Sequence, residues 1–275
     1  MRIVNLSDDR KSDKDLLHDH GLSFYIETET RKYLFDVGPA VNFIHNANRL
    51  KINLREVDYL IISHNHYDHI GGLQYFMEIN QKAKIYIKKD AIYETFYMRQ
   101  CYRNPMGRYY NELKEWDRVV FVEDTLQLDD LFLVSDTNGK KEYFAQGSDY
   151  FIDKNGEVSA DVFSHEQFIV YINDGMANII SACSHRGIRN IIETVKKQFG
   201  LPINSIIAGL HLALYAGKGI NCTEEYYFGL VDYLLEQEYS SFYTCHCTGK
   251  FAYELLKRDM KNRIGYFHLG DEIII

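Results

Sequence analysis

Three histidines and an aspartate lie close together in the segment SHNHYDHIGGL, residues 63–73. In the spacing His64-x-His66-x-Asp68-His69, all four side chains fall on one turn of the chain. Neutral imidazole and carboxylate are ligands that suit zinc, iron or manganese. Two imidazoles two residues apart can bind one ion, and Asp68 and His69 can face a second ion about 3.5–4 Å away, a separation that recurs in catalytic metal pairs. The spacing therefore predicts a site for two metal ions.

Other side chains that bind metals follow the ends of other predicted strands. In sheets packed between helices, ligand sites form at the carboxyl ends of the strands. A chance scatter of eleven histidines would not select such positions repeatedly. The residues concerned are Asp36 after YLF, Cys183 and His185 after NIISA, His211 after IIAGL, and His246 after FYTC.

The segments that position these residues alternate between strand and helix patterns. Asp174-Gly175 favours a tight hairpin turn between two β-rich runs. Thr223 is a candidate N-cap and Gly200 a candidate C-cap. Without repeats or low-complexity linkers, residues 1–275 are predicted to form a single domain. Strands are expected at 2–6, 23–27, 32–37, 57–62, 84–87, 118–123, 131–135, 205–210 and 241–246, and helices at 41–50, 73–81, 187–200, 222–237 and 250–260.

Residues 90–117 interrupt this rhythm with a concentration of tyrosine, phenylalanine, methionine and arginine. One interpretation is a lid insertion whose aromatic rings stack on a planar substrate, while Arg99, Arg103 and Arg108 bind a phosphate or carboxylate through forked hydrogen bonds. The alternative is an amphipathic helix pair that packs on the sheet or forms a homodimer contact. Residues 136–165 are polar and are expected to form a long connection.

Composition limits the classes of partner. The formal net charge is −8 and no basic run occurs, so we expect no nucleic-acid partner, although a local arginine cluster can still bind a small anionic substrate. No apolar run is long enough to span a membrane or to act as a signal peptide, which favours a cytoplasmic protein without membrane contact. Five cysteines, an odd number, argue against a disulfide framework. Cys245 and Cys247 are expected to pack in the core.

The segment SHNHYDHIGGL resembles the signature of the metallo-β-lactamase superfamily, and FDVG at 35–38 resembles its first motif. More narrowly, ACSHRGIRNII, AGLHL and CHCTG resemble the branch that contains archaeal dihydropterin ribofuranosyl-aminobenzene phosphate synthases. The resemblance extends over about residues 20–270. It implies an α/β fold, an αββα sandwich of two mixed β-sheets flanked by helices, with two metal ions at its edge.

The resemblance also implies a ligand set. His64 and His66 would hold one metal ion, Asp68, His69 and His246 the other, and His185 would add a further ligand. Asp36 would orient a ligand imidazole without touching the metal. Zinc is the expected metal, with manganese or iron as alternatives. Where most members have a bridging aspartate this chain has Cys183, so Cys183, His185 and His211 remain alternatives for that role, and His165 is a candidate for the histidine that usually precedes the hairpin.

The predicted activity is hydrolysis of a small anionic ester, a phosphate-containing one, by metal-bound hydroxide. Asp68 would hold the hydroxide and His211 would protonate the leaving group. Arg186, at a predicted helix N-terminus, would add an anion contact. One alternative is a synthase similar to the pterin enzyme, which joins a pterin carbon to an aminobenzene derivative and expels pyrophosphate. Another is a metal-binding sensor without turnover.

Overall fold

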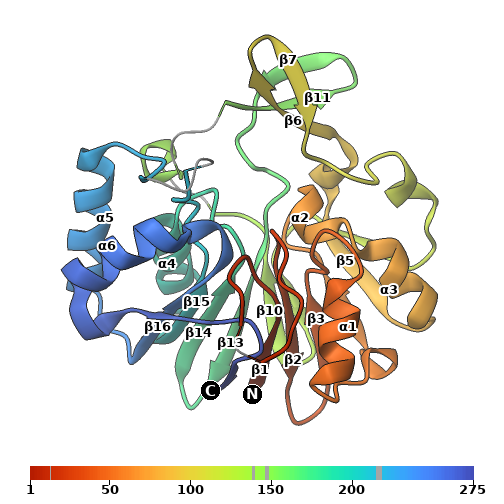
Figure 1. The fold of residues 1–275 in the computed structure, drawn as a ribbon, viewed down its shortest axis with the longest axis horizontal. Coiled ribbons are helices and arrows are strands. Elements are labelled where there is room, and N and C mark those ends of the chain that lie inside the picture. The colour runs from red at the N-terminus through yellow and green to blue at the C-terminus, as the bar shows by residue number, and fades with distance from the viewer. Residues whose placement is uncertain (13, 138–139, 146–148, 215–218) are drawn as a thin grey trace. The chain divides into compact units, whose positions relative to one another are not determined.

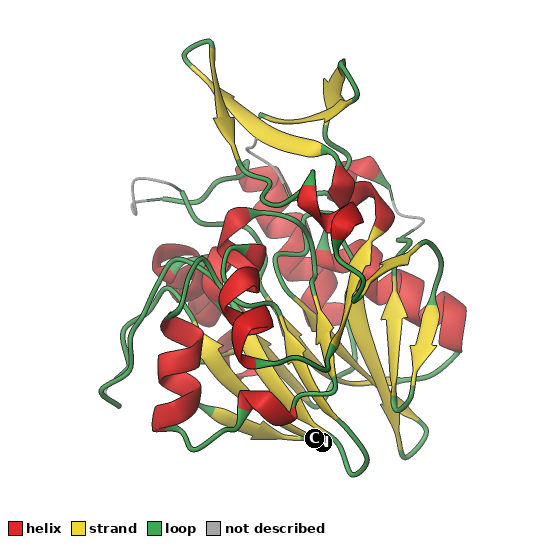
Figure 2. Cartoon of the chain, turned by 90° about the vertical axis from the view of Figure 1, so that its right-hand side faces the viewer, coloured by secondary structure: helices red, strands yellow, loops and turns green. Residues whose placement is uncertain are grey.

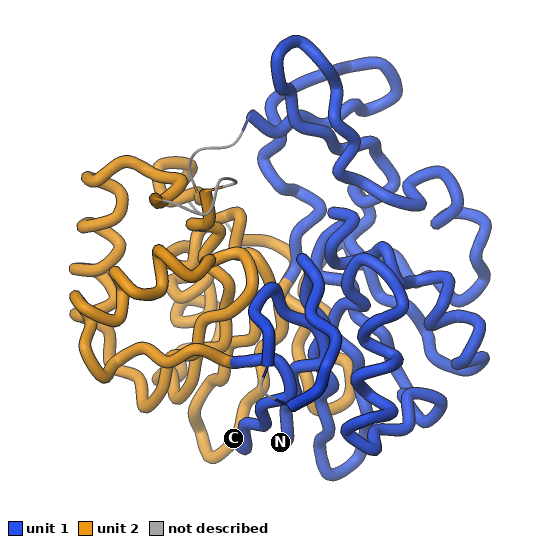
Figure 3. The backbone as a smooth tube through the Cα atoms, in the orientation of Figure 1, with its two compact units in different colours: residues 1–124, 149–167, 268–275 blue, residues 125–148, 168–267 orange. Residues whose placement is uncertain are grey.

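A computed structural model describes residues 1–12, 14–137, 140–145, 149–214 and 219–275. The chain packs as two compact units (Figure 3). Unit 1 contains residues 1–124, 149–167 and 268–275, and unit 2 contains residues 125–148 and 168–267. The single domain expected from the sequence stays a prediction.

Unit 1 is built on a mixed sheet of seven strands in the order β18-β1-β2-β3-β4-β5-β8. The strands from β18 to β3 pair antiparallel, and those from β3 to β8 pair parallel. The parallel strands therefore present their carboxyl ends at one edge. The strands are β1 (Arg2–Ser7), β2 (Ser23–Glu27), β3 (Lys32–Phe35), β4 (Tyr59–Ile61), β5 (Lys84–Lys88), β8 (Val119–Val122) and β18 (Glu272–Ile274).

The helices of unit 1 cover this sheet, as Figure 1 shows for α1 and α3. Phe43 of α1 and Phe76 of α3 are almost completely buried in one apolar cluster with Leu34, Leu60 and Ile85 of the strands. These helices are therefore held by apolar packing against the sheet. They are α1 (Asn42–Arg49), α2 (Tyr67–Ile70) and α3 (Leu73–Ile79), with short 3₁₀ turns η1 (Leu54–Glu56), η2 (Lys89–Ile92) and η3 (Glu112–Glu115).

A second, antiparallel sheet in unit 1 occupies the segment rich in aromatic residues. Strands β6 (Glu94–Arg99) and β7 (Tyr102–Pro105) form a hairpin, and β11 (Tyr150–Lys154) and β12 (Glu157–Ala160) form another. The two hairpins join through β6 and β11 into the order β12-β11-β6-β7, and we call this the small sheet (Figure 2). The helix-pair interpretation of this segment is wrong, and so is the prediction of a long connection between residues 136 and 165. Each hairpin completes the other by pairing distant segments, which local sequence patterns do not reveal.

Unit 2 contains a seven-stranded sheet in the order β17-β16-β15-β14-β13-β10-β9. Strands β14 to β17 pair parallel, and the remaining neighbours pair antiparallel. Three adjacent strands, β14, β15 and β16, therefore end at the same edge. The strands are β9 (Leu126–Leu128), β10 (Leu131–Val134), β13 (Phe168–Asn173), β14 (Met176–Ser181), β15 (Ile203–Ala208), β16 (Ser241–Thr244) and β17 (Gly265–Tyr266).

Several local predictions are confirmed in unit 2. Asp174 and Gly175 both have positive φ in the β13–β14 turn. Gly200 ends α4 in the left-handed conformation, and Thr223 accepts a hydrogen bond from the Tyr226 amide at the start of α5. The helices are α4 (Ile188–Phe199), α5 (Glu224–Glu236) and α6 (Lys250–Met260), with 3₁₀ turns η4 (Lys141–Tyr143), η5 (His246–Thr248) and η6 (Lys261–Arg263). Within the described part of the chain, none of the helices has the length and apolar character needed to cross a membrane.

Gly71 and Gly72 are needed because backbone passes very close to them. A Cβ at Gly71 would lie 2.3 Å from the Pro39 carbonyl oxygen, and one at Gly72 would lie 2.3 Å from that of Val37. Both glycines have negative φ, so the requirement is for space and not for a left-handed conformation. The glycines thus let α2 and α3 pack against the loop after β3, where Asp36 lies.

Gly72→Ala is therefore expected to lower the free energy of unfolding by about 1–3 kcal/mol or more, because the obstructing atoms are backbone and cannot rotate away. Urea unfolding measures this effect. Gly229→Ala is the matched control: Gly229 lies in α5 with open space around it, so alanine should be neutral or stabilise by up to about 1 kcal/mol. Equal stability of Gly72→Ala and the native protein would contradict the packing argument.

Candidate metal centre

Asp36 and Ser63 are brought together by the parallel pairing of β3 and β4. Asp36 follows β3 and Ser63 follows β4, and both are fully buried. Asp36 Oδ1 accepts the Ser63 amide at 2.7 Å, while its Oδ2 accepts the Ser63 hydroxyl at 2.7 Å. The same Oδ2 lies 2.7 Å from Nδ1 of His69. Asp36 therefore joins the end of β4 to the signature histidines.

This network fixes the orientation of two imidazoles. A hydroxyl has one proton to donate, and Ser63 donates it to Asp36. The Ser63 oxygen therefore accepts from Nδ1 of His64, 2.8 Å away. Nδ1 of His69 donates to the carboxylate in the same manner. In both rings Nε2 is then the nitrogen that can bind a metal ion. This arrangement is usual for metal-ligating histidines, whose other nitrogen bonds to a carboxylate or another polar group. The hydrogen bond expected from Asp36 to a ligand candidate is present, and it reaches His69.

His66 and His69 have opposite protonation behaviour. Burial, followed by the neighbouring His165, lowers the pKa of His66 to about 3, so this ring is neutral at pH 7. Burial would also lower the pKa of His69, but the charges of Asp68 and Asp36 outweigh it and raise that pKa to about 9. Because a metal ion binds only the neutral ring, His69 must release a proton when it becomes a ligand.

The raised pKa of His69 leads to a pH prediction for the metal-free protein. The ordinary pKa of histidine is 6.5 and that of His69 in the folded protein is about 9, so protonated His69 stabilises the fold fully below pH 6.5. This contribution should be lost as the pH rises through 9. Over the same interval the apparent metal affinity should rise by up to about tenfold per pH unit, since binding displaces one proton. Thermal unfolding and metal titrations at several pH values measure both trends, and an affinity independent of pH would contradict this assignment.

His66 and its neighbour Asn65 connect the signature segment to the small sheet. The His66 ring stacks on Tyr150 of β11 with centroids 5.4 Å apart. Nδ2 of the Asn65 side chain donates to the carbonyls of Ala91 and Tyr93 at 2.6 and 3.2 Å, and the Thr95 hydroxyl of β6 donates to Asn65 Oδ1 at 3.0 Å. The small sheet is therefore held against the signature segment by its contacts with Asn65 and His66.

His165 and Asp161 form a buried pair that adds to the unit 1 cluster. Nε2 of His165 lies 3.0 Å from Asp161 Oδ2, and the His165 ring lies 5.4 Å from that of His66. One ligand atom each from His66, Asp161 and His165 lie within 4.8 Å of one another. Asp161 was not among the residues predicted from the sequence. Its spacing, four residues before a histidine, is the signal that could have revealed it.

Asp68 lies at the opposite side of His69 from Asp36. Its Oδ2 is 3.5 Å from Nε2 of His69 and 3.5 Å from Nε2 of His20. His20 in turn contacts Asp9 at 2.7 Å. The structure thus places His20 and Asp9, which were not among the predicted site residues, beside the signature carboxylate.

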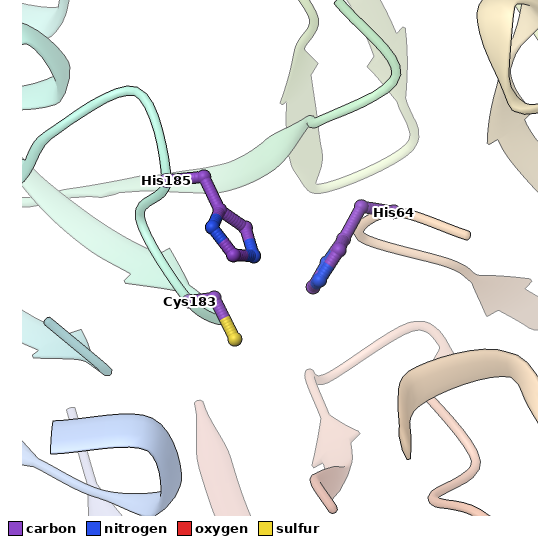
Figure 4. Close-up of side chains that lie close together, drawn as sticks. All are labelled: His64, Cys183 and His185. Atoms are coloured by element: carbon purple, nitrogen blue, oxygen red, sulfur yellow. The ribbon is translucent and has the colours of Figure 1, made fainter. Parts of the chain in front are cut away.

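In unit 2 the predicted residues gather after β14, β15 and β16. Cys183 and His185 both leave the loop after β14 (Figure 4). The rings of His185 and His211 are 4.2 Å apart between centroids. His246 is fully buried and opens η5. Parallel pairing of the three strands is what brings these distant segments to one edge.

Three of the residues described above, and Ser184 between Cys183 and His185, have an unusual backbone conformation. Asp36, Ser184, His211 and His246 have φ values of 61°, 52°, 50° and 41°. Residues other than glycine reach positive φ uncommonly, and such strained positions cluster at functional sites. The folding of both units therefore tolerates local strain where the candidate ligands and their supports lie.

The predicted arginines have diverse surroundings. Arg103 bonds to Asp153 at 3.1 Å and to Glu94 at 3.5 Å, and it covers the Phe96 ring at 4.2 Å. Arg186 lies 3.4 Å from Asp136. Arg99 and Arg108 are exposed, at the end of β6 and just after β7. Substrate binding by these four residues stays a prediction.

The donor chemistry fits divalent metal ions. Unit 1 supplies imidazole nitrogens with fixed orientation and a buried carboxylate, and unit 2 supplies imidazoles and thiols. These are the ligand types that bind zinc and related ions. The six predicted ligands divide between the units, with His64, His66, Asp68 and His69 in unit 1 and His185 and His246 in unit 2.

Comparison with known proteins supports the class of this site. The family model of the metallo-β-lactamase superfamily matches residues 18–139. A 7,8-dihydropterin-6-methyl-4-(β-D-ribofuranosyl)-aminobenzene-5'-phosphate synthase of Methanocaldococcus jannaschii is 28% identical over 267 residues, which cover 91% of this chain and 88% of that protein. An uncharacterized protein of the same organism is 27% identical over 277 residues and 98% of each chain. Tm1679, a metal-dependent hydrolase of the β-lactamase superfamily, is 28% identical with a TM-score of 0.83, and the match covers 100% of this chain and 99% of that one.

Residues 18–139 match the model of the metallo-β-lactamase superfamily, and the resemblance stated from the motifs is confirmed. The predicted fold class is also confirmed, with mixed sheets flanked by helices. The superfamily typically binds divalent metals, and the candidate clusters of His, Asp and Cys agree with that property.

Proposed function

We propose that this protein is a metal-dependent hydrolase of a small anionic ester, with phosphate-containing esters as the substrate class. The observation that carries the proposal is the Asp36–Ser63 network. It holds Nδ1 of His64 and of His69 and so prepares both rings to bind metal through Nε2. The 28% identity to a metal-dependent hydrolase over the whole chain supports the same activity.

We further propose that the protein binds two divalent cations, zinc by expectation. The proposed ligands are His64, His66, Asp68 and His69 of unit 1, and His185 and His246 of unit 2. Such ions make water a nucleophile near neutral pH and polarise a scissile ester bond. Within the chain, Asp36 fixes the His69 ring, and buried Asp68 is the carboxylate available to accept a proton from an attacking water.

The anionic character of the substrate is supported by arginines in unit 1. Arg103 would have to leave Asp153 and Glu94 in order to bind an anion. Arg99 and Arg108, whose side chains are exposed at the end of β6 and just after β7, are the other proposed anion contacts. An arginine fork binds phosphate through two parallel hydrogen bonds.

The test is an activity panel of phosphomonoesters and phosphodiesters, assayed after loading the protein with zinc, manganese or iron. Elemental analysis of each preparation gives the number of ions bound. We expect hydrolysis of at least one phosphate ester that depends on the loaded metal. Stoichiometric metal without turnover on any substrate would contradict the proposal and favour a sensor.

A synthase is the second candidate, because the M. jannaschii synthase is 28% identical over 91% of this chain. In that case the protein would join a dihydropterin to a ribofuranosyl-aminobenzene phosphate and release pyrophosphate. The measurement is pyrophosphate release from a dihydropterin diphosphate with and without the aminobenzene partner. Release that requires the partner would replace the hydrolase proposal.

A further inference from the structure

Two thiols and one imidazole meet at the ends of the three adjacent parallel strands of unit 2. Cys183 follows β14, His211 follows β15, and Cys247 follows β16. One ligand atom from each lies within 4.8 Å of the others. Cys183 is 2% exposed and Cys247 5%, so both thiols are removed from solvent. We call these three residues the thiol cluster.

The backbone around Cys247 is shaped to accommodate its sulfur. A Cβ at Gly209 would lie 2.6 Å from the Cys247 sulfur and 2.5 Å from the Ala182 carbonyl oxygen, so only glycine leaves room there. The His211 amide donates to the Cys247 sulfur at 3.3 Å. Thr248, the next residue, accepts from the Leu210 amide at 2.9 Å. The loops after β15 and β16 are thus locked together around the thiol.

Apolar packing alone does not account for this arrangement. A thiol that serves as a small core residue needs no amide donor and no imidazole beside it. An N–H group that bonds to a sulfur stabilises the thiolate, and such outer contacts are characteristic of metal-ligating groups. Two cysteines and one histidine are also a complete protein ligand set for a zinc ion that keeps one position open.

We propose that Cys183, His211 and Cys247 form a metal site for a thiophilic divalent cation such as zinc. The site lies within unit 2 and does not depend on the proposed hydrolase activity. In this proposal the buried Cys247 is a ligand as well as a core residue, and His211 is a ligand in place of the predicted proton donor to a leaving group. Since sulfur ligands select softer metals than imidazole and carboxylate, the thiol cluster should keep zinc or cadmium in the presence of manganese.

Cobalt(II) titration of the whole protein tests the site, because cobalt bound to thiolates absorbs in the near ultraviolet. The native protein should show this absorption. Cys183→Ser and Cys247→Ser should each lose about half of it, since each removes one of two sulfur ligands. Cys222→Ser is the matched control, a half-buried thiol of unit 2 outside the cluster, and it should retain the full signal. His66→Ala should also retain it, which separates this site from the proposed catalytic one.

Three outcomes would overturn the proposal: no sulfur absorption in the native protein, absorption that survives in the Cys183→Ser/Cys247→Ser variant, or loss with Cys183→Ser but not with Cys247→Ser. The last outcome would mean that Cys183 binds the metal ion and Cys247 does not. If a variant does not fold, a measurement on the native protein still tests the site. X-ray absorption at the zinc edge of the zinc-loaded native chain should show sulfur among the zinc ligands, and a ligand shell of nitrogen and oxygen alone would also refute the site.

Discussion

His66→Ala is expected to lower metal-dependent turnover by more than about a hundredfold, because mutation even of the outer partners of metal ligands typically costs 10–100-fold. The His66 ring is only 2% exposed, and its pKa of about 3 keeps it neutral at pH 7, the state that a metal requires. Replacing the ring by a methyl group removes the donor entirely. The measurement is the turnover of the best ester from the panel, together with the metal content of the purified variant.

The control for His66→Ala is His45→Ala, which removes an exposed imidazole on α1. This variant should retain native turnover and native metal content. His66→Ala also leaves a cavity against Tyr150, so its thermal unfolding must be recorded. A folded His66→Ala protein with native activity would refute the assignment of His66 as a ligand.

The sequence predicts the site best where the signal is local. The signature segment and the hairpin at Asp174-Gly175 each depend on residues a few positions apart, and the structure has the hairpin turn as expected. The predicted hydrogen bond of Asp36 to a ligand imidazole is also present, with His69. The parallel pairing of β3 and β4 in addition brings Asp36 to the Ser63 amide. Strand order in parallel sheets thus makes some distant contacts predictable.

Contacts that depend on irregular loops are not predictable in this way. The small sheet requires β6 to pair with β11, about fifty residues away in sequence, and no local pattern specifies that partner. The pairing of Asp161 with His165 depends on the turn that gives Phe163 a positive φ. Cys247 is buried, as predicted, at 5% exposure. The chain turns into η5 at His246, so the proximity of the Cys247 sulfur to Cys183 and His211 is a contact that alternation along a strand does not predict.

Asp36→Asn is expected to lower zinc affinity by about 10–100-fold without changing any predicted ligand. Asp36 accepts three hydrogen bonds, from the Ser63 amide, the Ser63 hydroxyl and His69. An asparagine has one oxygen to accept them, and its amide nitrogen can only donate. The His69 ring or the Ser63 hydroxyl must then lose its partner. The rings of His64 and His69 are then no longer held with Nε2 in a fixed orientation. Competition with a chromophoric zinc chelator measures the affinity.

Asparagine is the informative replacement because Asp36 has a φ of 61°, a conformation that asparagine adopts more readily than most residues. Asp36→Asn should therefore reduce affinity more than stability, with about 1–3 kcal/mol lost in urea unfolding for the unsatisfied buried group. Asp36→Ala adds backbone strain and should unfold more easily than Asp36→Asn. Ser63→Ala removes the hydroxyl but keeps the amide and the His69 contact, so its affinity should fall between those of the native protein and Asp36→Asn. If Asp36→Asn binds zinc as tightly as the native chain, the orientation of His69 does not limit metal binding, and the buried network serves the fold alone.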